Sequence, residues 1–503
     1  HRQVGSRGAE ENGMTELLAS LNTVTLWGAV AVVIQAGLTL GVVLRVILTR
    51  HPPASSLAWI VLTLALPYVG FILYLLIGEK PIGRWREFRM RQALYRWEAV
   101  LSQKPAAYVG ELPAGQRHKG LVRLAQKLGD IPMSRGSTIE LIGDTDAALK
   151  RIISDIDAAK TSVSMEFYIW SAGGLADAVA ESLIAAAGRG VACKVLLDDI
   201  GSHSFFKSAW PKRLQAAGVH VLSALPVRFF APTQGRLDLR LHRKTIVIDN
   251  RVGYTGSLNM VDPAFFNQNE HVGEWIDAMA RITGAAVADL NLVFSFDWAL
   301  QPDDAGQQFS FLPVPAVPPE GNARIVVVPS GPTAPDDANM RVIIEAINCA
   351  RRSVLISTPY FVPNEAMAVA LQNAAWRGVD VRLLLPAKND SQFVQWASHR
   401  YFEGLMAAGV KILRFNAGLL HTKAITVDDD FALFGTVNLD NRSLHLNFEM
   451  MLLVFDPKFV ADLVRLLRSY EARCLEVDPV TWHKRPLKDR LLEGICYLLS
   501  PLL

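Results

Sequence analysis

Two long stretches near the start of the chain carry no charged residue, one from Val24 to Leu44 and the other from Leu57 to Ile77. Each is long enough to cross the roughly 30 Å hydrocarbon core of a bilayer as an α-helix. A cleaved signal peptide is the alternative for the first stretch, but that stretch is too long for a signal core and a second one follows it closely. The pattern therefore predicts a two-helix transmembrane hairpin within residues 14–80.

Basic residues around the two stretches predict their orientation. Arg45 and Arg50 lie between the stretches, whereas the segment after Ile77 contains Lys80, Arg84, Arg86, Arg89, Arg91 and Arg96. Because juxtamembrane Lys and Arg are retained in the cytoplasm, we expect a multi-pass protein of a bacterial inner membrane with the rest of the chain on the cytoplasmic side. The basic linker, residues 81–135, either binds anionic head groups or forms a solvated helix face. We expect residues 1–13, which precede Met14, to be a cloning remnant and leave them out of the predicted fold.

Beyond residue 135, short β-rich runs alternate with helical patterns. The runs "STIELIG", "SVSMEFYIW" and "VACKVLLDD" are typical of strands. Between them, "DTDAALKRIISDIDAAK" predicts a helix with Asp144 as its N-cap, and "LADAVAESLIAAAGRG" predicts a helix that ends at glycine. This alternation predicts an α/β fold.

The alternating pattern occurs twice, on either side of a Pro-rich segment from Pro302 to Pro319. In the second part, "AAWRGVDVRLLL" matches the earlier "AAAGRGVACKVLL", and "LMAAGVKIL" matches "LQAAGVHVL". The sequence therefore predicts two repeated halves, residues 136–315 and 316–480, followed by an amphipathic tail over residues 481–503.

The offset between the two halves is not constant. It is 191 residues at Gly218 and Gly409 but 179 residues at His242 and His421, so the first half has twelve extra residues before His242. The insertion lies in "PVRFFAPTQGRLDLR", and it forms either a substrate-contacting loop or an ordinary surface loop.

The composition agrees with a chain that lies partly in lipid. Half of the 503 residues are hydrophobic, and the mean hydropathy is +0.21. The net charge of +3 is too balanced to indicate nucleic-acid binding, so we expect no nucleic-acid partner. The four cysteines are far apart and form neither a CxxC pair nor a disulfide framework, which indicates thiols in a reducing compartment.

The stretches "LHRKTIVIDNRVGYTGSLN" and "LHTKAITVDDDFALFGTVN" repeat the same residue types at the same spacing. In the first stretch the β-branched run predicts a strand, so that His242 and Lys244 share one face while Asp249 points to the other. The corresponding residues of the second stretch are His421, Lys423 and Asp428. We therefore expect the histidines and lysines to share a site, and the aspartates to hold the strand-end turns.

Small residues and an amide complete each copy of the motif. Ser257 and Asn259 in the first copy correspond to Thr436 and Asn438 in the second. Small residues allow backbone and side-chain donors to approach an anion closely.

A glutamate lies 28 residues after each motif histidine, Glu270 after His242 and Glu449 after His421. Such a carboxylate accepts the Nδ1 proton, fixes the tautomer and leaves Nε2 free to attack or to carry a proton. We therefore expect one His–Glu dyad in each half.

Brought together, two His, two Lys and two Asn form an anion site. It has one nucleophile and one acid–base group on opposite sides, as in-line displacement at phosphorus requires. Lys244 and Lys423 would neutralise the nonbridging phosphate oxygens in place of a metal. Because paired lysines repel a divalent cation, we expect no metal and no other cofactor.

These residues resemble the phospholipase D superfamily, whose HxKx4Dx6G[ST]xN signature occurs twice and builds one active site. Within it the chain resembles the bacterial cardiolipin synthases, through "HPPASSLAWI", "GSLNMVDPAFF", "STPYFVPNEAM", "NLDNRS" and "KRPLKDRLLEGICYLLSPLL". The resemblance implies duplicated phospholipase D-like domains, with mixed sheets flanked by helices about a pseudo-twofold axis. It also implies transfer of a phosphatidyl group between two phosphatidylglycerol molecules, giving cardiolipin and glycerol. In this interpretation His242 is the nucleophile and His421 the general acid–base, although the near-equivalent copies also allow the reverse.

Three further side chains are candidates for substrate binding. Tyr168 and Tyr360 lie beside Phe167 and Phe361 in the two halves, and these aromatics either line the lipid entrance or pack in the core. Arg442 suits the geometry of a phosphate, with ordinary salt bridging as the alternative.

The hydrophobic tail from Leu491 to Leu503 is too short to span a membrane. It follows the cations Lys484, Arg485, Lys488 and Arg490. The tail therefore either lies in the membrane interface or packs as a core helix on the second half.

Other functions share some of these features. A hydrolytic phospholipase D has the same catalytic residues and differs only in its acceptor. A nucleic-acid-processing relative would need a long basic groove with stacking aromatics, and a non-catalytic scaffold would not need both motifs intact. Phosphatidylglycerol and other anionic membrane lipids are the expected partners of an integral membrane enzyme, and the sequence leaves an oligomer open.

Overall fold

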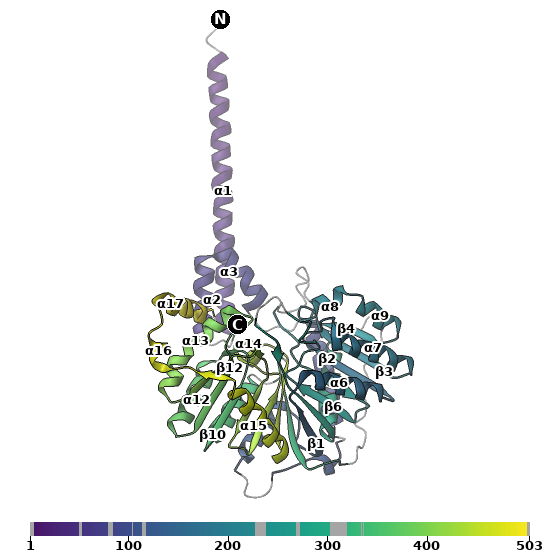
Figure 1. The fold of residues 1–503 in the computed structure, drawn as a ribbon. Helices are drawn as coiled ribbons and strands as arrows, with labels where there is room; N and C mark the ends of the chain where they lie inside the picture. Colours follow the sequence, from purple (N-terminus) through teal and green to yellow (C-terminus); the bar gives the residue numbers. More distant parts are fainter. Residues whose placement is uncertain are drawn as a thin grey trace. The chain divides into compact units, whose positions relative to one another are not determined.

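The computed structural model describes residues 5–49, 53–78, 84–102, 104–112, 117–226, 238–267, 272–301, 319–332, 334 and 337–499. The chain divides into two units (Figure 1). Unit 1 is His1–Pro81 with Gly235–Asp238, and unit 2 is Ile82–Gln234 with Leu239–Leu503. Glu270, most of the Pro-rich segment and most of the insertion before His242 lie outside the described residues.

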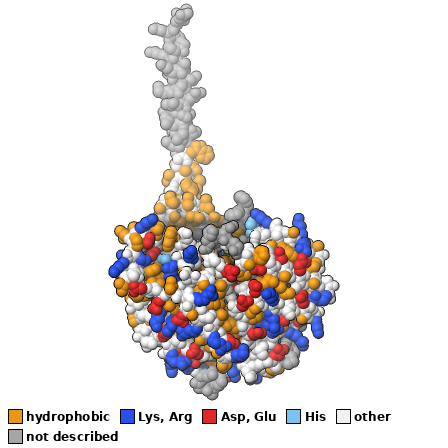
Figure 2. All heavy atoms as spheres, in the orientation of Figure 1, with side chains coloured by type: hydrophobic (Ala, Val, Ile, Leu, Met, Phe, Trp, Pro, Cys, Tyr) orange, Lys and Arg blue, Asp and Glu red, His pale blue; other side chains and the backbone are white. Residues whose placement is uncertain are grey.

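Unit 1 consists of helices that are mostly apolar from Trp27 onward. Its elements are α1 (Gly5–Leu48), α2 (Pro53–Ala65), α3 (Pro67–Leu73) and a π-helical turn, η1 (Tyr74–Gly78). Within the described residues, the segment Trp27–Leu48 of α1 is long and apolar enough to cross a membrane. Its side chains are mostly exposed and hydrophobic (orange in Figure 2), as expected of a helix that packs against lipid.

The single helix expected over residues 57–77 is wrong. Pro67 has no N–H, and its ring clashes with the carbonyl group four residues earlier in a continuous helix. Leu66 accordingly leaves the helical region (φ −135°, ψ 72°), so α2 ends at Ala65 and α3 begins at Pro67. Both are shorter than a membrane span, and the two-helix hairpin is therefore only partly seen.

Unit 2 is built on one 15-stranded sheet. The strands of its first half are β1 (Ser134–Ile142), β2 (Ser162–Phe167), β3 (Ala192–Asp198), β4 (His220–Ala224), β5 (Thr245–Ile248), β6 (Val252–Gly256) and β8 (Met279–Gly284). The strands of its second half are β9 (Ala323–Ser330), β10 (Ser353–Ser357), β12 (Asp380–Pro386), β13 (Lys411–Phe415), β15 (Ala424–Val427), β16 (Phe431–Gly435), β18 (Glu449–Phe455) and β19 (Cys474–Glu476).

The strand order shows the duplication directly. Outward from the central antiparallel pair β1–β9, one side runs β8-β6-β5-β2-β3-β4 and the other runs β18-β16-β15-β10-β12-β13. Each position on one side has a counterpart on the other, and β19 extends the second edge. The predicted α/β fold with two repeated halves is confirmed.

Helices cover both faces of the sheet (Figure 1). In the first half and before it they are α4 (Arg84–Ser102), η2 (Ala106–Tyr108), α5 (Lys119–Gly129), α6 (Thr145–Asp157), α7 (Gly174–Gly188), α8 (His203–Lys207), α9 (Trp210–Ala216) and α10 (Ala286–Ala299). In the second half they are α11 (Ala338–Cys349), α12 (Glu365–Trp376), α13 (Gln392–Ala407), α14 (Asn441–His445), α15 (Pro457–Glu471), α16 (Pro479–His483) and α17 (Leu487–Leu498).

Local sequence signals explain where the first of these helices begin and end. The predicted N-cap of α6 is confirmed, because the Asp144 carboxylate accepts a hydrogen bond from the N–H of Ala147 at 2.7 Å. Helix α7 ends just before Gly190, which has a φ of +87° that glycine adopts without strain.

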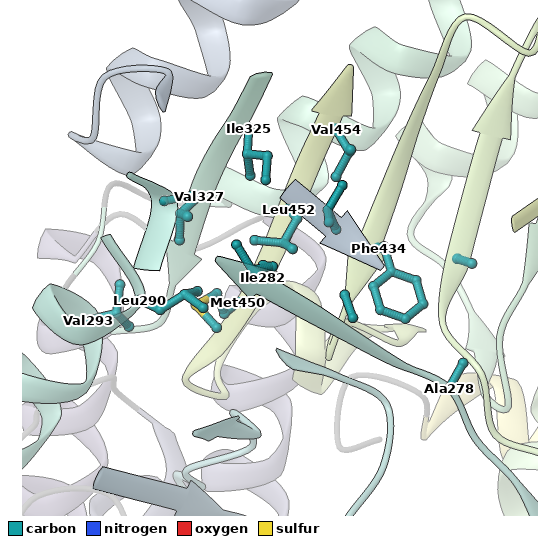
Figure 3. Close-up of a cluster of buried hydrophobic side chains, with 14 of the residues drawn as sticks. Ala278, Ile282, Leu290, Val293, Ile325, Val327, Phe434, Met450, Leu452 and Val454 are labelled. Atoms are coloured by element: carbon teal, nitrogen blue, oxygen red, sulfur yellow. The ribbon is translucent and has the colours of Figure 1, made fainter. Parts of the chain in front are cut away.

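The hydrophobic core joins the two halves. Ile282 of β8 packs in one cluster with Val327 of β9 and Leu452 of β18 (Figure 3). Leu290 and Val293 extend the same cluster from α10, a helix buried on nearly all sides. Since this cluster is shared, the halves are held as one body in which side chains from opposite halves can meet.

Candidate active site

Each His–Lys pair lies in an extended segment that enters a buried strand. His242 and Lys244 precede β5, and His421 and Lys423 precede β15. The His242 N–H donates to the Phe448 carbonyl at 2.9 Å, across the interface between the halves. The backbone of the second half thus positions the segment that carries the first motif.

The second motif repeats this arrangement. The His421 N–H donates to the carbonyl of Ile276 at 2.9 Å, where β14 (Leu419–Leu420) pairs in parallel with β7 (Trp275–Ile276). These backbone hydrogen bonds fix the position of each segment, and therefore the position from which each histidine side chain extends.

The histidines pair with carboxylates across the same interface. His242 Nδ1 lies 2.8 Å from Glu449 Oε1, and His421 Nδ1 lies 2.7 Å from Asp277 Oδ1. The expected dyad of His421 with Glu449, within one half, is therefore wrong. Glu270, the expected partner of His242, lies outside the described residues.

Asp277, which the sequence analysis missed, is the structural counterpart of Glu449. Gly256 pairs with Met279 in one half and Gly435 pairs with Met451 in the other, and each acid lies two residues before its methionine. Asp277 follows His242 by 35 residues rather than 28, because the loop before β7 is longer than its counterpart. An alignment on the β8 and β18 strands, instead of on a fixed spacing, would have found it.

Burial keeps both imidazoles neutral at neutral pH. It lowers the pKa of His242 to about 4, against the raising effect of Glu449, and the pKa of His421 to about 3, against the raising effect of Asp277. Each imidazole also feels the lysine of the opposite half, which places both pairs in one site. With Nδ1–H donated to a carboxylate, each Nε2 keeps a free lone pair.

The two lysines are buried cations beside these rings. The Lys244 ammonium donates to the His242 carbonyl and the Lys423 ammonium to the His421 carbonyl, each at 2.7 Å. Burial lowers the pKa of Lys244 to about 8 and that of Lys423 to about 7. Each ammonium has two further N–H groups, so the pair offers several donors to an anion between the halves.

The small polar residues of the motifs have different partners. Asn259 Oδ1 accepts from the Ile169 N–H at 3.2 Å, whereas Asn438 Oδ1 is buried and has no hydrogen-bond partner among the described residues. Ser257 accepts from the N–H of Ala278 at 3.0 Å.

Thr436 is also used within the protein. Its hydroxyl donates to Glu449 and accepts from the Met450 N–H at 3.0 Å. Both Ser257 and Thr436 are fully buried, and these hydrogen bonds hold the strands that carry the two acids, so substrate binding by the two hydroxyls stays a prediction.

Asp249 and Asp428 lie at the strand-end turns, away from the histidines. Both have positive φ, 52° and 54°, and their carboxylates accept backbone N–H groups from the turn before the neighbouring strand. These contacts agree with the structural role expected for the two aspartates.

Comparison with known proteins gives the family. The family described as "Cardiolipin synthase, PLD-like domain" matches residues 152–298 and 343–470, and a phospholipase D-nuclease N-terminal family matches residues 37–79. Cardiolipin synthase A of Yersinia pseudotuberculosis serotype O:1b (strain IP 31758) is 42% identical over 475 residues, 92% of this chain and 96% of that protein. Cardiolipin synthase A of Yersinia pestis gives the same figures. The chain belongs to the cardiolipin synthase family of the phospholipase D superfamily.

A solved structure supports the fold of this family member. The phosphatidylserine synthase of Haemophilus influenzae Rd KW20 superposes with a TM-score of 0.58 at 15% identity, covering 76% of this chain and all of that one. At this identity the likeness concerns the fold alone.

An aromatic ring flanks the histidine of each motif. The ring of Tyr168 lies 5.0 Å from that of His242, and the ring of Trp275 lies 4.3 Å from that of His421. Tyr168, a candidate substrate residue, thus lies beside His242, and the sequence analysis missed Trp275, which aligns with Asn447 in the second half. Both rings shield the imidazoles from bulk water.

The remaining candidates are divided between the site and the core. Tyr360 donates to the Asp390 carboxylate at 2.7 Å, and burial, the Asp390 carboxylate and nearby Tyr168 raise the pKa of Tyr360. Phe167 and Phe361 are fully buried in separate hydrophobic clusters, so core packing is the correct alternative for both. Arg442 lies at the start of α14. Burial and the Asp198 carboxylate raise the pKa of Tyr168, and the positive charge of Arg442 acts in the opposite direction.

Arg243, inside the first motif, is a further residue that sequence reasoning missed. Its guanidinium donates to the Glu449 carbonyl at 2.9 Å and to the Ser330 carbonyl at 3.0 Å, both in the second half. Arg243 also donates to the Asp297 carboxylate. Glu166 lies beside Asp297, and burial and the Asp297 carboxylate raise the pKa of Glu166. Arg243 therefore ties the acid of the His242 dyad to the first half.

We predict that Arg243→Met lowers the free energy of unfolding by roughly 3–5 kcal/mol, because it leaves Asp297 buried without its cation. Adding Asp297→Asn should recover more than half of this loss. The exposed pair Arg213–Glu181 is the control, and Arg213→Met should cost less than about 1 kcal/mol. The measurement is denaturant unfolding of the detergent-solubilised chain. A double variant that loses the full sum of both single effects would contradict the assignment.

Proposed function

We propose that the chain is a phosphatidyltransferase that converts two phosphatidylglycerol molecules into cardiolipin and glycerol through a phosphatidyl-histidine intermediate. The crossed pairs His242–Glu449 and His421–Asp277 carry this proposal. They give two neutral imidazoles from opposite halves, each oriented by a carboxylate and flanked by a lysine. In-line displacement at phosphorus needs such groups on opposite sides of one phosphate.

In the first step, His242 Nε2 attacks the phosphorus of the donor lipid. The P–N bond forms while the bond from phosphorus to the glycerol oxygen breaks, and His421 gives its Nε2 proton to that oxygen. The bound phosphodiester anion raises the pKa of His421, which lets this imidazole carry the proton. Lys244 and Lys423 stabilise the charge that develops on the nonbridging oxygens.

In the second step, a second phosphatidylglycerol replaces the glycerol. His421 accepts the proton of its primary hydroxyl, the oxygen attacks phosphorus, and the P–N bond breaks to restore His242. One phosphodiester replaces another, so the exchange needs no nucleotide.

The assignment of His242 as nucleophile rests on the family resemblance and on one asymmetry. Glu449 accepts hydrogen bonds from both His242 and Thr436, which fix this carboxylate from two sides. A rigidly held imidazole is suited to nucleophilic attack, since it needs little reorganisation to reach phosphorus.

The placement of the enzyme in the membrane is part of the proposal. Unit 1 supplies the apolar α1 and the shorter helices α2 and α3, which together would make a multi-pass anchor. The excess of Lys and Arg after the second apolar stretch supports a catalytic region on the cytoplasmic side.

We predict that the purified chain converts phosphatidylglycerol to equimolar cardiolipin and glycerol, without nucleotide. Thin-layer or mass-spectrometric analysis of the products measures this. Phosphatidic acid as the main product would identify a hydrolytic phospholipase D instead and overturn the transfer reaction.

Alanine variants of the two histidines should differ in whether they accumulate the covalent intermediate. With labelled phosphatidylglycerol, His421→Ala should retain an acid-labile lipid adduct on the protein, whereas His242→Ala should retain none. His220→Ala, an exposed histidine on β4, serves as the control and should behave as the unaltered chain. The opposite pattern would reverse the two roles, and full turnover in both variants would refute a two-histidine mechanism.

The lysines should give the reaction an alkaline limit. Lys423 and Lys244 lose their charge as the pH rises through about 7 and about 8, so phosphate binding weakens in that range. We therefore predict that kcat/KM falls above neutral pH with apparent pKa values near these two. Lys423→Arg, which stays charged, should remove the lower step and keep the upper one. A flat profile through pH 9 in the unaltered chain would be inconsistent with this role.

A further inference from the structure

Helix α17, close to the C-terminus, has two different faces. Its Glu493 and Cys496 are buried against α13. Glu493 also pairs with Arg485 at 2.8 Å, and the ring of Tyr497 packs against that of Tyr401 at 5.5 Å. One face of the helix is thus packed on the second half, which agrees with the core-helix alternative for that face of the tail.

The other face is apolar and open. Leu487, Leu491, Ile495 and Leu498 are 70%, 59%, 55% and 75% exposed. Their spacing of four, four and three residues places them in a single stripe along the helix. Single exposed leucines are common on protein surfaces, whereas a full stripe marks a surface that binds something apolar.

Exposed cations accompany the stripe. Lys484, Lys488 and Arg490 are all exposed on or just before α17. Figure 2 shows hydrophobic side chains with Lys and Arg nearby in this part of unit 2. An apolar stripe with cations beside it fits the interface of an anionic bilayer, where the stripe enters the acyl region and the cations meet head groups.

The stripe lies on the outer side of a wall of the active site. Cys496 of α17 packs in one cluster with Val362, at the end of β11 (Phe361–Val362). Strand β11 pairs in parallel with β17 (Leu439–Asp440), which directly follows Asn438 of the second motif. Helix α13, on which α17 rests, starts two residues after Asp390, the partner of Tyr360.

We infer that the exposed face of α17 docks on an anionic lipid bilayer and thereby holds the second-half wall of the active site at the membrane surface. This surface is additional to the apolar helices of unit 1, and its benefit for turnover rests on the proposed function. The substrate is itself a bilayer lipid, so a site held at the surface takes up its head group without extracting the whole molecule.

The first test compares two substrates with the full-length chain reconstituted in phosphatidylcholine bilayers. Leu491→Glu together with Ile495→Glu should raise the mole fraction of phosphatidylglycerol needed for half-maximal rate by about tenfold. The rate on a short-chain, monomeric phosphatidylglycerol in detergent should stay unchanged. Trp376→Glu is the matched control, since Trp376 is a 68% exposed apolar residue on α12, and it should change neither rate.

The second test does not depend on catalysis. A polarity-sensitive fluorophore on Ile495→Cys should be quenched by nitroxide-labelled lipids in phosphatidylglycerol bilayers, and the same label on Trp376→Cys should not. The labelled unaltered chain corrects for native cysteines. No quenching, or protection of the label by dimer formation without quenching, would overturn the docking surface. If the chain made no cardiolipin but the label were quenched, the proposed function would fail while the docking surface stood.

Discussion

The imidazole of each motif histidine pairs with a carboxylate that the other half of the chain supplies. His242 without Glu449, or His421 without Asp277, would lack the group that fixes its tautomer, and a half on its own has neither pair. This pairing across the halves explains why both copies of the motif are present in one chain. It also explains the extensive burial, because the pairing works only where water does not compete for the carboxylates.

The continuous sheet makes this pairing between the two halves possible. Strands β1 and β9 join the halves into one continuous sheet, and the cluster around Ile282, Val327 and Leu452 fills the space beside this junction. Arg243 adds a polar connection, since it reaches from the first motif to two carbonyl groups of the second half. The same low-dielectric junction lowers the pKa of the histidines and lysines, so stability and reactivity have one physical origin.

The sequence predicted the α/β fold and the duplication, and it marked the two motifs, because repeated spacing and hydrophobic period can be read along the chain. It failed for Asp277, Trp275 and the crossed pairing, which depend on a loop of unequal length and on contacts between distant strands. The helix break at Pro67 was visible in the sequence but was outweighed by the length of the apolar run. Arg243 gave no signal, since only the tertiary structure shows what its guanidinium meets.

The central claim is that both imidazoles face one phosphorus atom, and a structure with bound vanadate tests it most directly. Vanadate adopts the trigonal-bipyramidal geometry of phosphoryl transfer. The account predicts one vanadium between His242 Nε2 and His421 Nε2 in the two apical directions, with Lys244 and Lys423 on the equatorial oxygens. Vanadate bound to one histidine only, with the other ring turned to a separate pocket, would contradict it.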